Sequence, residues 1–286
     1  MLNILITGSN GQLGNEIRAI SELYPYYNFL FTDIGELDIT DPVQVEQYFE
    51  ENNIDVIINC AAYTAVDRAE QQPESAMLIN CSAVANLAQV CKKNDIYLVH
   101  ISTDYVFDGR NHIPYKESDR PNPTSSYGKS KLAGEEAITS CLEKGMIIRT
   151  SWLYSSFGSN FVKTILKKGT EKGHLDVVND QFGCPTYAGD LAATILEILP
   201  KALSIQQLEV FHYANEGECS WYEFAKAAIE LANIPCQVNP VTSDKYPQLA
   251  PRPVYSVLET TRIKNRFGTT IPEWKESLRK CISLLV

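Results

Sequence analysis

The 286-residue sequence lacks the marks of several common classes of protein. No apolar run approaches the roughly 18 residues that a membrane-spanning helix needs. The N-terminus shows no basic region followed by an apolar stretch and a small-residue cleavage site, as a secretory leader would. Internal repeats and low-complexity segments are also missing. From these absences we expect a cytoplasmic protein that does not contact a membrane.

The sequence also has few of the patterns that bind metals or nucleic acids. Its eight cysteines include no CxxC pair and its four histidines no HxxxH pair, so we expect no metal site. The cysteines are expected to be small core residues. A formal net charge of −10 argues against a nucleic-acid partner. A small anionic ligand is not excluded, because it meets only local groups.

What the sequence does contain is a glycine-rich turn between an apolar run and a helical pattern. Leu2–Thr7 is typical of a buried parallel strand, and Gly8, Gly11 and Gly14 follow it. Gly8 permits a sharp turn, Gly11 lets a pyrophosphate approach the backbone, and Gly14 lets the helix pack on the sheet. The N–H groups at the helix start would face the anion. Although the spacing is not GxGxxG, its strand–turn–helix context favours a dinucleotide site.

An aspartate after the second predicted strand fits the same interpretation. Asp33 follows the strand expected over 28–32, close to the spacing at which an acid binds the adenosine ribose hydroxyls. The alternative is a strand-end aspartate that caps a turn. Asp38 and Ile39, a few residues further on, are candidates to lie under the adenine.

The order of elements predicts an α/β fold. Strands alternate with helices over residues 1–150, which indicates a doubly wound parallel sheet of the Rossmann type. We expect residues 1–150 to form a dinucleotide-binding domain, joined by elements near 186–215. Residues 151–185 and 216–286 would form a smaller C-terminal α/β substrate-binding lobe.

Four further elements are expected from the sequence. A helix over 75–93 contains Asn80, which is either a buried bridge or exposed. A second helix is expected over 157–168, and a strand over 210–215 returns to the sheet. Residues 235–253 contain several prolines and no period, so we expect a loop there.

A tyrosine and a lysine one helical turn apart suggest proton-transfer chemistry. Tyr127 and Lys131 share one face of a helix capped by Ser125 or Ser126. A lysine ammonium beside the phenol favours phenolate and would lower its pKa toward neutrality. Thr103, at the end of a predicted strand, can hydrogen-bond a substrate oxygen. Any helix can show a YxxxK pattern by chance, but here it accompanies a glycine turn and a Ser-Thr-Asp strand end.

The chain resembles the extended short-chain dehydrogenases through TGSNGQLG, NCAA, STDYVF and YGKSK, in that order. More narrowly, it is similar to the dTDP-4-dehydrorhamnose reductase family. The segments that carry this resemblance are CAAYTAVDRAE, HISTDYVFDG, RTSWLY, GSNFVK, NDQFGCPT and APRPVYSVL. Together they span nearly the whole chain and are far more specific than the glycine turn.

The resemblance implies a reaction and a set of site residues. The reaction would be NAD(P)H-dependent reduction of the C4 ketone of dTDP-4-dehydro-L-rhamnose to dTDP-L-rhamnose. Tyr127 would be the proton donor, and Lys131 its partner and a ribose ligand. The cofactor contacts implied are Gly11, Gln12 and Leu13 at the pyrophosphate, Asp33, Asp38 and Ile39 at the adenosine, and Ala61, Ala62, Tyr63 and Thr64 at the nicotinamide. The substrate contacts implied are Thr103, Asp104, Trp152, Asn160 and Arg252.

Arg252 and Asp33 carry the two specificity expectations. Arg252 lies between two prolines that stiffen the backbone, and its guanidinium can bind a diphosphate, although a surface arginine is the alternative. Asp33 should repel a 2′-phosphate, and no Lys or Arg occurs between Arg18 and Arg68. We therefore expect NADH to be accepted at least as well as NADPH.

One departure from the family concerns assembly. Some relatives pair subunits through a Mg²⁺ ion held by glutamates, and Glu16 matches one such position. Gly189 stands where another glutamate is expected, with Asp190 beside it, which argues against that mode. We expect a monomer or a homodimer.

Two other functions remain open from the sequence. The chain could be a reductase or epimerase that acts on another nucleotide sugar. It could instead be a regulatory subunit that binds a dinucleotide without catalysis, as a eukaryotic relative serves a methionine adenosyltransferase. The presence of both Tyr127 and Lys131 weighs against the second possibility.

Overall fold

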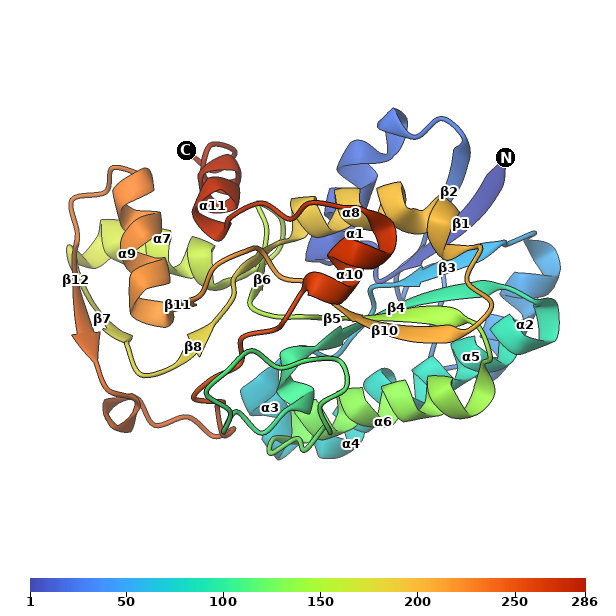
Figure 1. Ribbon diagram of the computed structural model, residues 1–286, viewed down its shortest axis with the longest axis horizontal. Coiled ribbons are helices and arrows are strands. Elements are labelled where there is room, and N and C mark those ends of the chain that lie inside the picture. Colours follow the sequence, from blue (N-terminus) through green and yellow to red (C-terminus); the bar gives the residue numbers. More distant parts are fainter.

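The computed structural model describes residues 1–286 and is built around a six-stranded parallel sheet (Figure 1). The strand order is β10-β5-β4-β3-β1-β2, and every pairing is parallel. The strands are β1 (Leu2–Thr7), β2 (Tyr27–Phe31), β3 (Val56–Asn59), β4 (Tyr97–Thr103), β5 (Gly145–Thr150) and β10 (Leu208–His212). The predicted doubly wound sheet is confirmed, including the late strand that returns to it.

Helices cover both faces of the sheet, as the continuous apolar character of its strands requires. One face packs against α1 (Gln12–Ile20) and α8 (Ala188–Ala202), and the other against α2 (Pro42–Glu51), α5 (Ala83–Asn94) and α6 (Ser126–Cys141) (Figure 1). A short helix, α10 (Thr261–Phe267), also packs on the first face through Ile263 and Phe267. It lies in the stretch expected to belong to the second lobe.

The helix expected over 75–93 is interrupted. The structure has α3 (Val66–Gln71), α4 (Pro73–Met77), a π-helical segment over Leu78–Ser82, and then α5. Pro73 separates α3 from α4, because the residue before a proline disfavours helical backbone. Asn80 in the π-helical segment is fully buried, which settles the open choice between a bridge and an exposed side chain.

The second lobe lies beside the carboxyl ends of the sheet strands (Figure 1). It contains α7 (Phe161–Lys172), α9 (Trp221–Leu231) and α11 (Trp274–Ile282), with β7 (His174–Val178) paired to β12 (Gln237–Val241). Short strand pairs join β6 (Leu153–Tyr154) to β9 (Thr186–Tyr187) and β8 (Phe182–Gly183) to β11 (Cys219–Ser220). An aromatic cluster that includes Trp274, Phe224 and Tyr154 forms the core of this lobe.

Two expectations for the second lobe were wrong. The helix expected over 157–168 begins at Phe161, because the side chain of Asn160 accepts from the N–H of Lys163 and caps it. Residues 235–253, expected to be a loop, contain β12. Its Pro240 is tolerated because β12 pairs on one side only and the missing N–H lies on the free edge. None of the helices combines the length and the apolar character needed to cross a membrane.

Candidate active site

A cavity of about 550 Å³ opens where β1, β3, β4 and β5 end. The chain continues from β1 to β2 on one side of β1, and then crosses to β3 on the other side. The cavity therefore lies at the switch point at which such sheets bind ligands. Eleven predicted site residues line the cavity: Gly11, Gln12, Leu13, Ala62, Thr64, Thr103, Asp104, Tyr127, Lys131, Trp152 and Asn160.

The glycine turn has the geometry that its sequence predicts. Gly8 has a φ of +63°, and a Cβ there would lie 2.6 Å from backbone atoms of Ala61. A Cβ on Gly14 would lie 2.5 Å from the Cα of Ser9, so that position also excludes larger residues. Gly11 is the N-cap of α1 and supplies no side-chain cap. The N–H groups of the first helical turn, which have no partner within a helix, therefore remain available to an anion.

Three predicted adenosine contacts lie outside the cavity. The Asp33 carboxylate accepts from the backbone N–H of Asn10, 3.0 Å away, and from that of Ile34. Asp38 accepts from the backbone N–H and the hydroxyl of Thr40. The side chain of Ile39 is buried in the core beneath the sheet. Asp33 is thus next to the glycine turn, whereas Ile39 can offer a ligand only its backbone.

Tyr127 and Thr103 lie together on the cavity wall. Tyr127 is 9% exposed, and its ring meets Tyr105 edge-on with 5.5 Å between the ring centroids. Burial raises the pKa of Tyr127 above its ordinary value, and hydrogen bonding with Thr103 opposes part of that rise. The Thr103 hydroxyl donates to Asp104 Oδ1 at 3.0 Å. The phenol therefore keeps its proton at neutral pH, although the sequence predicted a lowered pKa.

Asp104 is the acidic group nearest to this pair. It is 2% exposed, and burial raises the pKa of its carboxyl to about 6. Because the carboxylate sits in the cavity wall beside Thr103 and Tyr127, it adds negative potential to the site.

Lys131 is held deep in the cavity wall, at 1% exposure. Its Nζ donates to the carbonyl of Ile101 at 2.7 Å and lies 3.3 Å from His100 Nε2. Burial lowers the pKa of Lys131 to about 8, while Glu135 and Cys60 oppose that shift. The contacts with Ile101 and His100, both in β4, thus fix the position of the Lys131 amine.

Asn80 fixes the loop after β3. Its Oδ1 accepts from the N–H of Tyr63 at 2.8 Å, and its Nδ2 donates to the carbonyl of Tyr63 at 3.0 Å. The same Nδ2 donates to Ser130 Oγ at 2.9 Å, next to Lys131 in α6. The π-helical segment thus ties the predicted nicotinamide loop, Ala61–Thr64, to the helix that carries Tyr127 and Lys131.

Trp152 stacks on another tryptophan. Its ring is 3.5 Å from that of Trp221 and nearly parallel to it, at 9°. Trp152 has a φ of +47°, and a Cβ on Gly183 would lie 2.6 Å from its Cε2. At most one face of the Trp152 indole is open to a ligand, which the sequence did not predict.

Asn160 has structural partners of its own. Besides capping α7, its Nδ2 donates to Gln12 Oε1 at 2.9 Å, and Gln12 Nε2 donates to the carbonyl of Leu153. These bonds join the glycine turn of the sheet lobe to the start of α7. A contact with a ligand would have to use the remaining hydrogen-bonding capacity of this amide.

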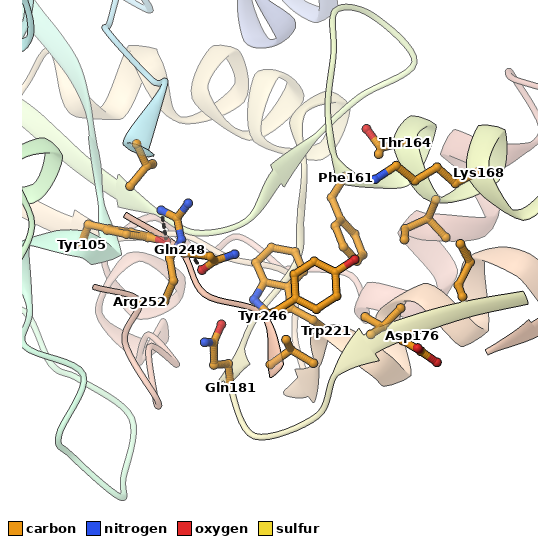
Figure 2. A pocket seen from close by; sticks show the side chains of 15 residues that line it. Tyr105, Phe161, Thr164, Lys168, Asp176, Gln181, Trp221, Tyr246, Gln248 and Arg252 are labelled. Carbon is orange, nitrogen blue, oxygen red and sulfur yellow. Dashed lines mark hydrogen bonds between the residues drawn. The ribbon is translucent and has the colours of Figure 1, made fainter. Parts of the chain in front are cut away.

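A second cavity of about 390 Å³ adjoins the first and is shown in Figure 2. Phe161, Trp221 and Tyr246 lie in its middle, with Lys168 at one end and Arg252 at the other (Figure 2). Val66, Tyr105, Phe161 and Trp221 line both cavities. The two spaces therefore form neighbouring compartments along the cleft between the sheet and the second lobe.

Arg252 lines the second cavity and is already paired. Its Nη2 lies 2.7 Å from Asp67 Oδ2, its Nη1 3.3 Å from the hydroxyl of Tyr105, and its Nε 2.9 Å from Gln248 Oε1. The stiff segment predicted from its flanking prolines thus holds the guanidinium in a defined place. Its charge is partly balanced by Asp67.

Several lining residues were missed by sequence reasoning. Tyr105, Phe161 and Trp221 border both cavities, and Lys168 and Tyr246 border the second. Ser220 caps α9 and stands directly before Trp221. An aromatic residue at the first helical position gives no sign in the sequence that it faces a ligand. Such contacts depend on how the second lobe packs against the sheet.

Glu16 and Asp190, the two acidic residues considered for a shared metal ion, are both hydrogen-bonded within the chain. Glu16 is 4% exposed and accepts from the Ser155 hydroxyl at 2.5 Å. Asp190 accepts from Asn215 Nδ2 at 2.9 Å and from the hydroxyl of Ser277. No group of three or more His, Cys, Asp or Glu side chains converges anywhere in the structure.

Comparisons with known proteins agree with this geometry. The family described as RmlD substrate binding domain matches residues 2–286. A dTDP-4-dehydrorhamnose reductase from Aggregatibacter actinomycetemcomitans is 39% identical over 98% of both chains. The solved structure of a dTDP-4-dehydrorhamnose reductase from Clostridium acetobutylicum is 42% identical, with a TM-score of 0.95 and 99% of each chain covered. Another, from Bacillus anthracis in complex with NADP, is 39% identical, with a TM-score of 0.94 and the same coverage.

Proposed function

The chain belongs to the RmlD substrate binding domain family, and from that premise we propose how its residues carry out the reaction. It is an NAD(P)H-dependent oxidoreductase that reduces the C4 ketone of dTDP-4-dehydro-L-rhamnose to dTDP-L-rhamnose. The observation that carries the assignment of roles is the placement of Tyr127 and Thr103 together in a cavity that is also lined by the glycine turn and Lys131.

The dinucleotide is assigned to the sheet side of the first cavity. The uncapped start of α1 would hold its pyrophosphate, and Gly11 leaves room for close approach. When bound, the reduced dinucleotide supplies a hydride. Ala62 and Thr64 would flank the nicotinamide, with the loop held by Asn80. Lys131 would bind the ribose.

Tyr127 acts as the general acid. Because burial keeps the phenol protonated, it can donate a proton to the oxygen that gains negative charge at C4. Thr103, whose hydroxyl proton is directed to Asp104, presents its oxygen toward Tyr127 and orients the phenol. When Lys131 is protonated, it places a positive charge near the phenolate that remains after Tyr127 has donated its proton.

The sugar nucleotide is assigned to the cleft between the lobes. Its sugar would occupy the first cavity against Trp152 and Asp104, and its diphosphate and base would extend into the second. Phe161, Trp221 and Tyr246 offer aromatic surface there, and Arg252 and Lys168 offer positive charge. This division assigns dinucleotide binding to the sheet lobe and substrate binding largely to the second lobe.

The remaining assignments concern cofactor choice, assembly and location. We expect NADH to serve at least as well as NADPH, because Asp33 lies beside the glycine turn. We expect a monomer or a homodimer that does not depend on Mg²⁺, because Glu16 and Asp190 already have protein partners. A cytoplasmic location fits the eight free thiols, since reducing compartments favour unpaired cysteine.

Purified protein should oxidise NADH when dTDP-4-dehydro-L-rhamnose is added, and the product should be dTDP-L-rhamnose. A panel of other 4-keto nucleotide sugars run in parallel tests the competing reductase or epimerase assignment. Faster turnover of a different sugar would identify that sugar as the substrate instead. Dinucleotide binding without turnover of any keto sugar would favour a regulatory subunit.

A further inference from the structure

Behind Lys131, buried polar side chains continue into the sheet, and the mechanism above does not use them. His100 on β4 and Asn59 on β3 are both fully buried. The His100 ring lies between its two neighbours: Nε2 is 3.3 Å from Lys131 Nζ, and Nδ1 is 3.0 Å from Asn59 Nδ2. The ring is therefore placed to pass the influence of Asn59 to the lysine.

The orientation of the Asn59 amide follows from a neighbour that can only donate. Asn59 Oδ1 lies 3.1 Å from the backbone nitrogen of Ala61 and 2.7 Å from Thr7 Oγ1. A backbone N–H cannot accept a hydrogen bond, so the amide atom that faces Ala61 must be the oxygen. The amide NH₂ group then faces His100, and His100 Nδ1 must be the acceptor.

This orientation determines the tautomer of His100. Burial and the neighbouring Lys131 lower the pKa of His100 well below its usual range, so the ring is neutral and carries one proton. Since Nδ1 accepts, the proton is on Nε2 and points at Lys131 Nζ. A neutral amine has a lone pair to receive it, whereas an ammonium has none. The contact therefore favours the amine.

We propose that Asn59 and His100 form a positioning pair that holds the Nε2–H of His100 against Lys131 and stabilises its neutral amine relative to the ammonium. This rests on the proposed role of Lys131 beside Tyr127. The pair thereby sets the pH at which Lys131 loses its positive charge. Neither residue lines the cavity, so the pair acts through Lys131.

The other ionisable groups near Lys131 act differently. Burial of the lysine favours the amine, in the same direction as His100. Glu135, one turn along α6, favours the ammonium, but it is paired with Arg149 Nη2 at 2.6 Å. Burial raises the pKa of Cys60 to about 12, so its thiol is neutral near pH 7. His100 is the one neutral group placed to donate a hydrogen bond to the amine.

The tautomer can be read directly by ¹⁵N NMR of histidine-labelled full-length protein. The chain has four histidines, so the spectrum is sparse, and a His100→Gln variant assigns the signal. We expect a neutral ring protonated at Nε2 throughout pH 6–9. A ring protonated at Nδ1, or an imidazolium, would overturn the proposal. Because no substrate is needed, the result is independent of whether the protein is a reductase.

The effect on the lysine is tested by titrating Lys131 through its ¹⁵Nζ signal. His100→Leu should raise the pKa of Lys131 by about one unit, a tenfold change in proton affinity. The alkaline limb of the pH–rate profile should move upward by the same amount. His212→Gln, a fully buried histidine on β10, is the matched control and should leave both unchanged. An unchanged Lys131 pKa in His100→Leu would contradict the proposal.

A second variant covers the case in which His100→Leu does not fold. Asn59→Ser keeps His100 but removes the amide NH₂ that points at Nδ1. We expect the His100 proton to redistribute toward Nδ1 and the pKa of Lys131 to rise. Persistence of the Nε2–H tautomer in this variant would show that Asn59 does not control it.

Discussion

The two cavities lie side by side and are built in different ways. The wall of the first cavity that holds Thr103, Tyr127 and Lys131 is formed where β4 ends and α6 begins, so regular elements of the sheet lobe place these residues. Residues of the second lobe, such as Trp152 and Trp221, line the rest of it. The second draws Phe161 from α7, Trp221 from α9 and Arg252 from an irregular segment, with Tyr105 from the other lobe. The catalytic wall of the first cavity is therefore fixed by the topology of the sheet, and the second cavity by how separate segments pack together.

Under the proposed function, the chemical step takes place in the first cavity, and the second binds the diphosphate and base of the substrate. Variants in the first should therefore change the rate of the chemical step, and variants in the second should change substrate affinity. We test this division with variants that change rate or affinity, and compare the stability of the two regions with one further pair of variants, beginning with the largest expected effect.

Removing the Tyr127 hydroxyl should affect the first cavity most. Tyr127→Phe keeps the ring but loses the acidic proton, and general acid catalysis is typically worth about 10²–10⁴-fold. We expect kcat to fall by that factor and NADH binding, measured by fluorescence titration, to stay the same. Tyr154→Phe is the matched control, because that buried hydroxyl has no hydrogen-bond partner and lines neither cavity. More than half of the wild-type kcat in Tyr127→Phe would remove Tyr127 from the mechanism.

Loss of an ion pair should destabilise the protein more at α6, the helix that carries Tyr127, than at α9 in the second lobe. Glu135 in α6 pairs with Arg149 in β5, and both side chains are 5% exposed. Glu135→Ala leaves a buried arginine unpaired, which should cost about 3–5 kcal/mol in the free energy of unfolding, measured with urea. Glu230→Ala in α9 breaks an exposed pair with Lys226 and should cost less than about 0.5 kcal/mol. Equal losses in the two variants would contradict the account.

Arg252 tests the second cavity. Arg252→Ala should raise KM for the sugar nucleotide, with a loss of about 1.5–3 kcal/mol for charged hydrogen bonds, while NADH affinity stays constant. Asp67→Asn frees the guanidinium from its ion pair and should not raise KM. Arg110→Ala, in the loop before Tyr115, serves as the control for loss of a positive charge. A normal KM in Arg252→Ala would shift the diphosphate assignment to Lys168.

Asp33, which lies beside the glycine turn and outside the first cavity, gives the smallest expected effect. Asp33→Ser removes the carboxylate that would repel a 2′-phosphate, so kcat/KM for NADPH should rise about tenfold relative to NADH. The comparison is made with both dinucleotides in wild type and variant. A wild-type preference for NADPH of more than tenfold would show that a basic group elsewhere in the chain receives the 2′-phosphate.

The same division explains how far the sequence could predict the structure. Leu2–Thr7, the glycine turn and the Tyr127–Lys131 pair follow local rules of period, turn chemistry and spacing, and the structure places them at one edge of the sheet. Local rules failed where tertiary contacts decide. β12 exists because β7 pairs with it, and Trp152 faces Trp221 because α9 packs beside it. The lowered pKa predicted for Tyr127 was wrong, because burial of the phenol raises its pKa and Lys131 is not among the groups that shift it.

The central claim is that this protein delivers a hydride to C4 of a dTDP-linked keto sugar. The most direct measurement uses NADH deuterated at the transferable position and dTDP-4-dehydro-L-rhamnose, with the product analysed by NMR and mass spectrometry. We predict one deuterium at C4 of dTDP-L-rhamnose, formed by the wild type and only slowly by Tyr127→Phe. Oxidised dinucleotide without deuterium at C4, or no oxidation with this sugar, would contradict the account.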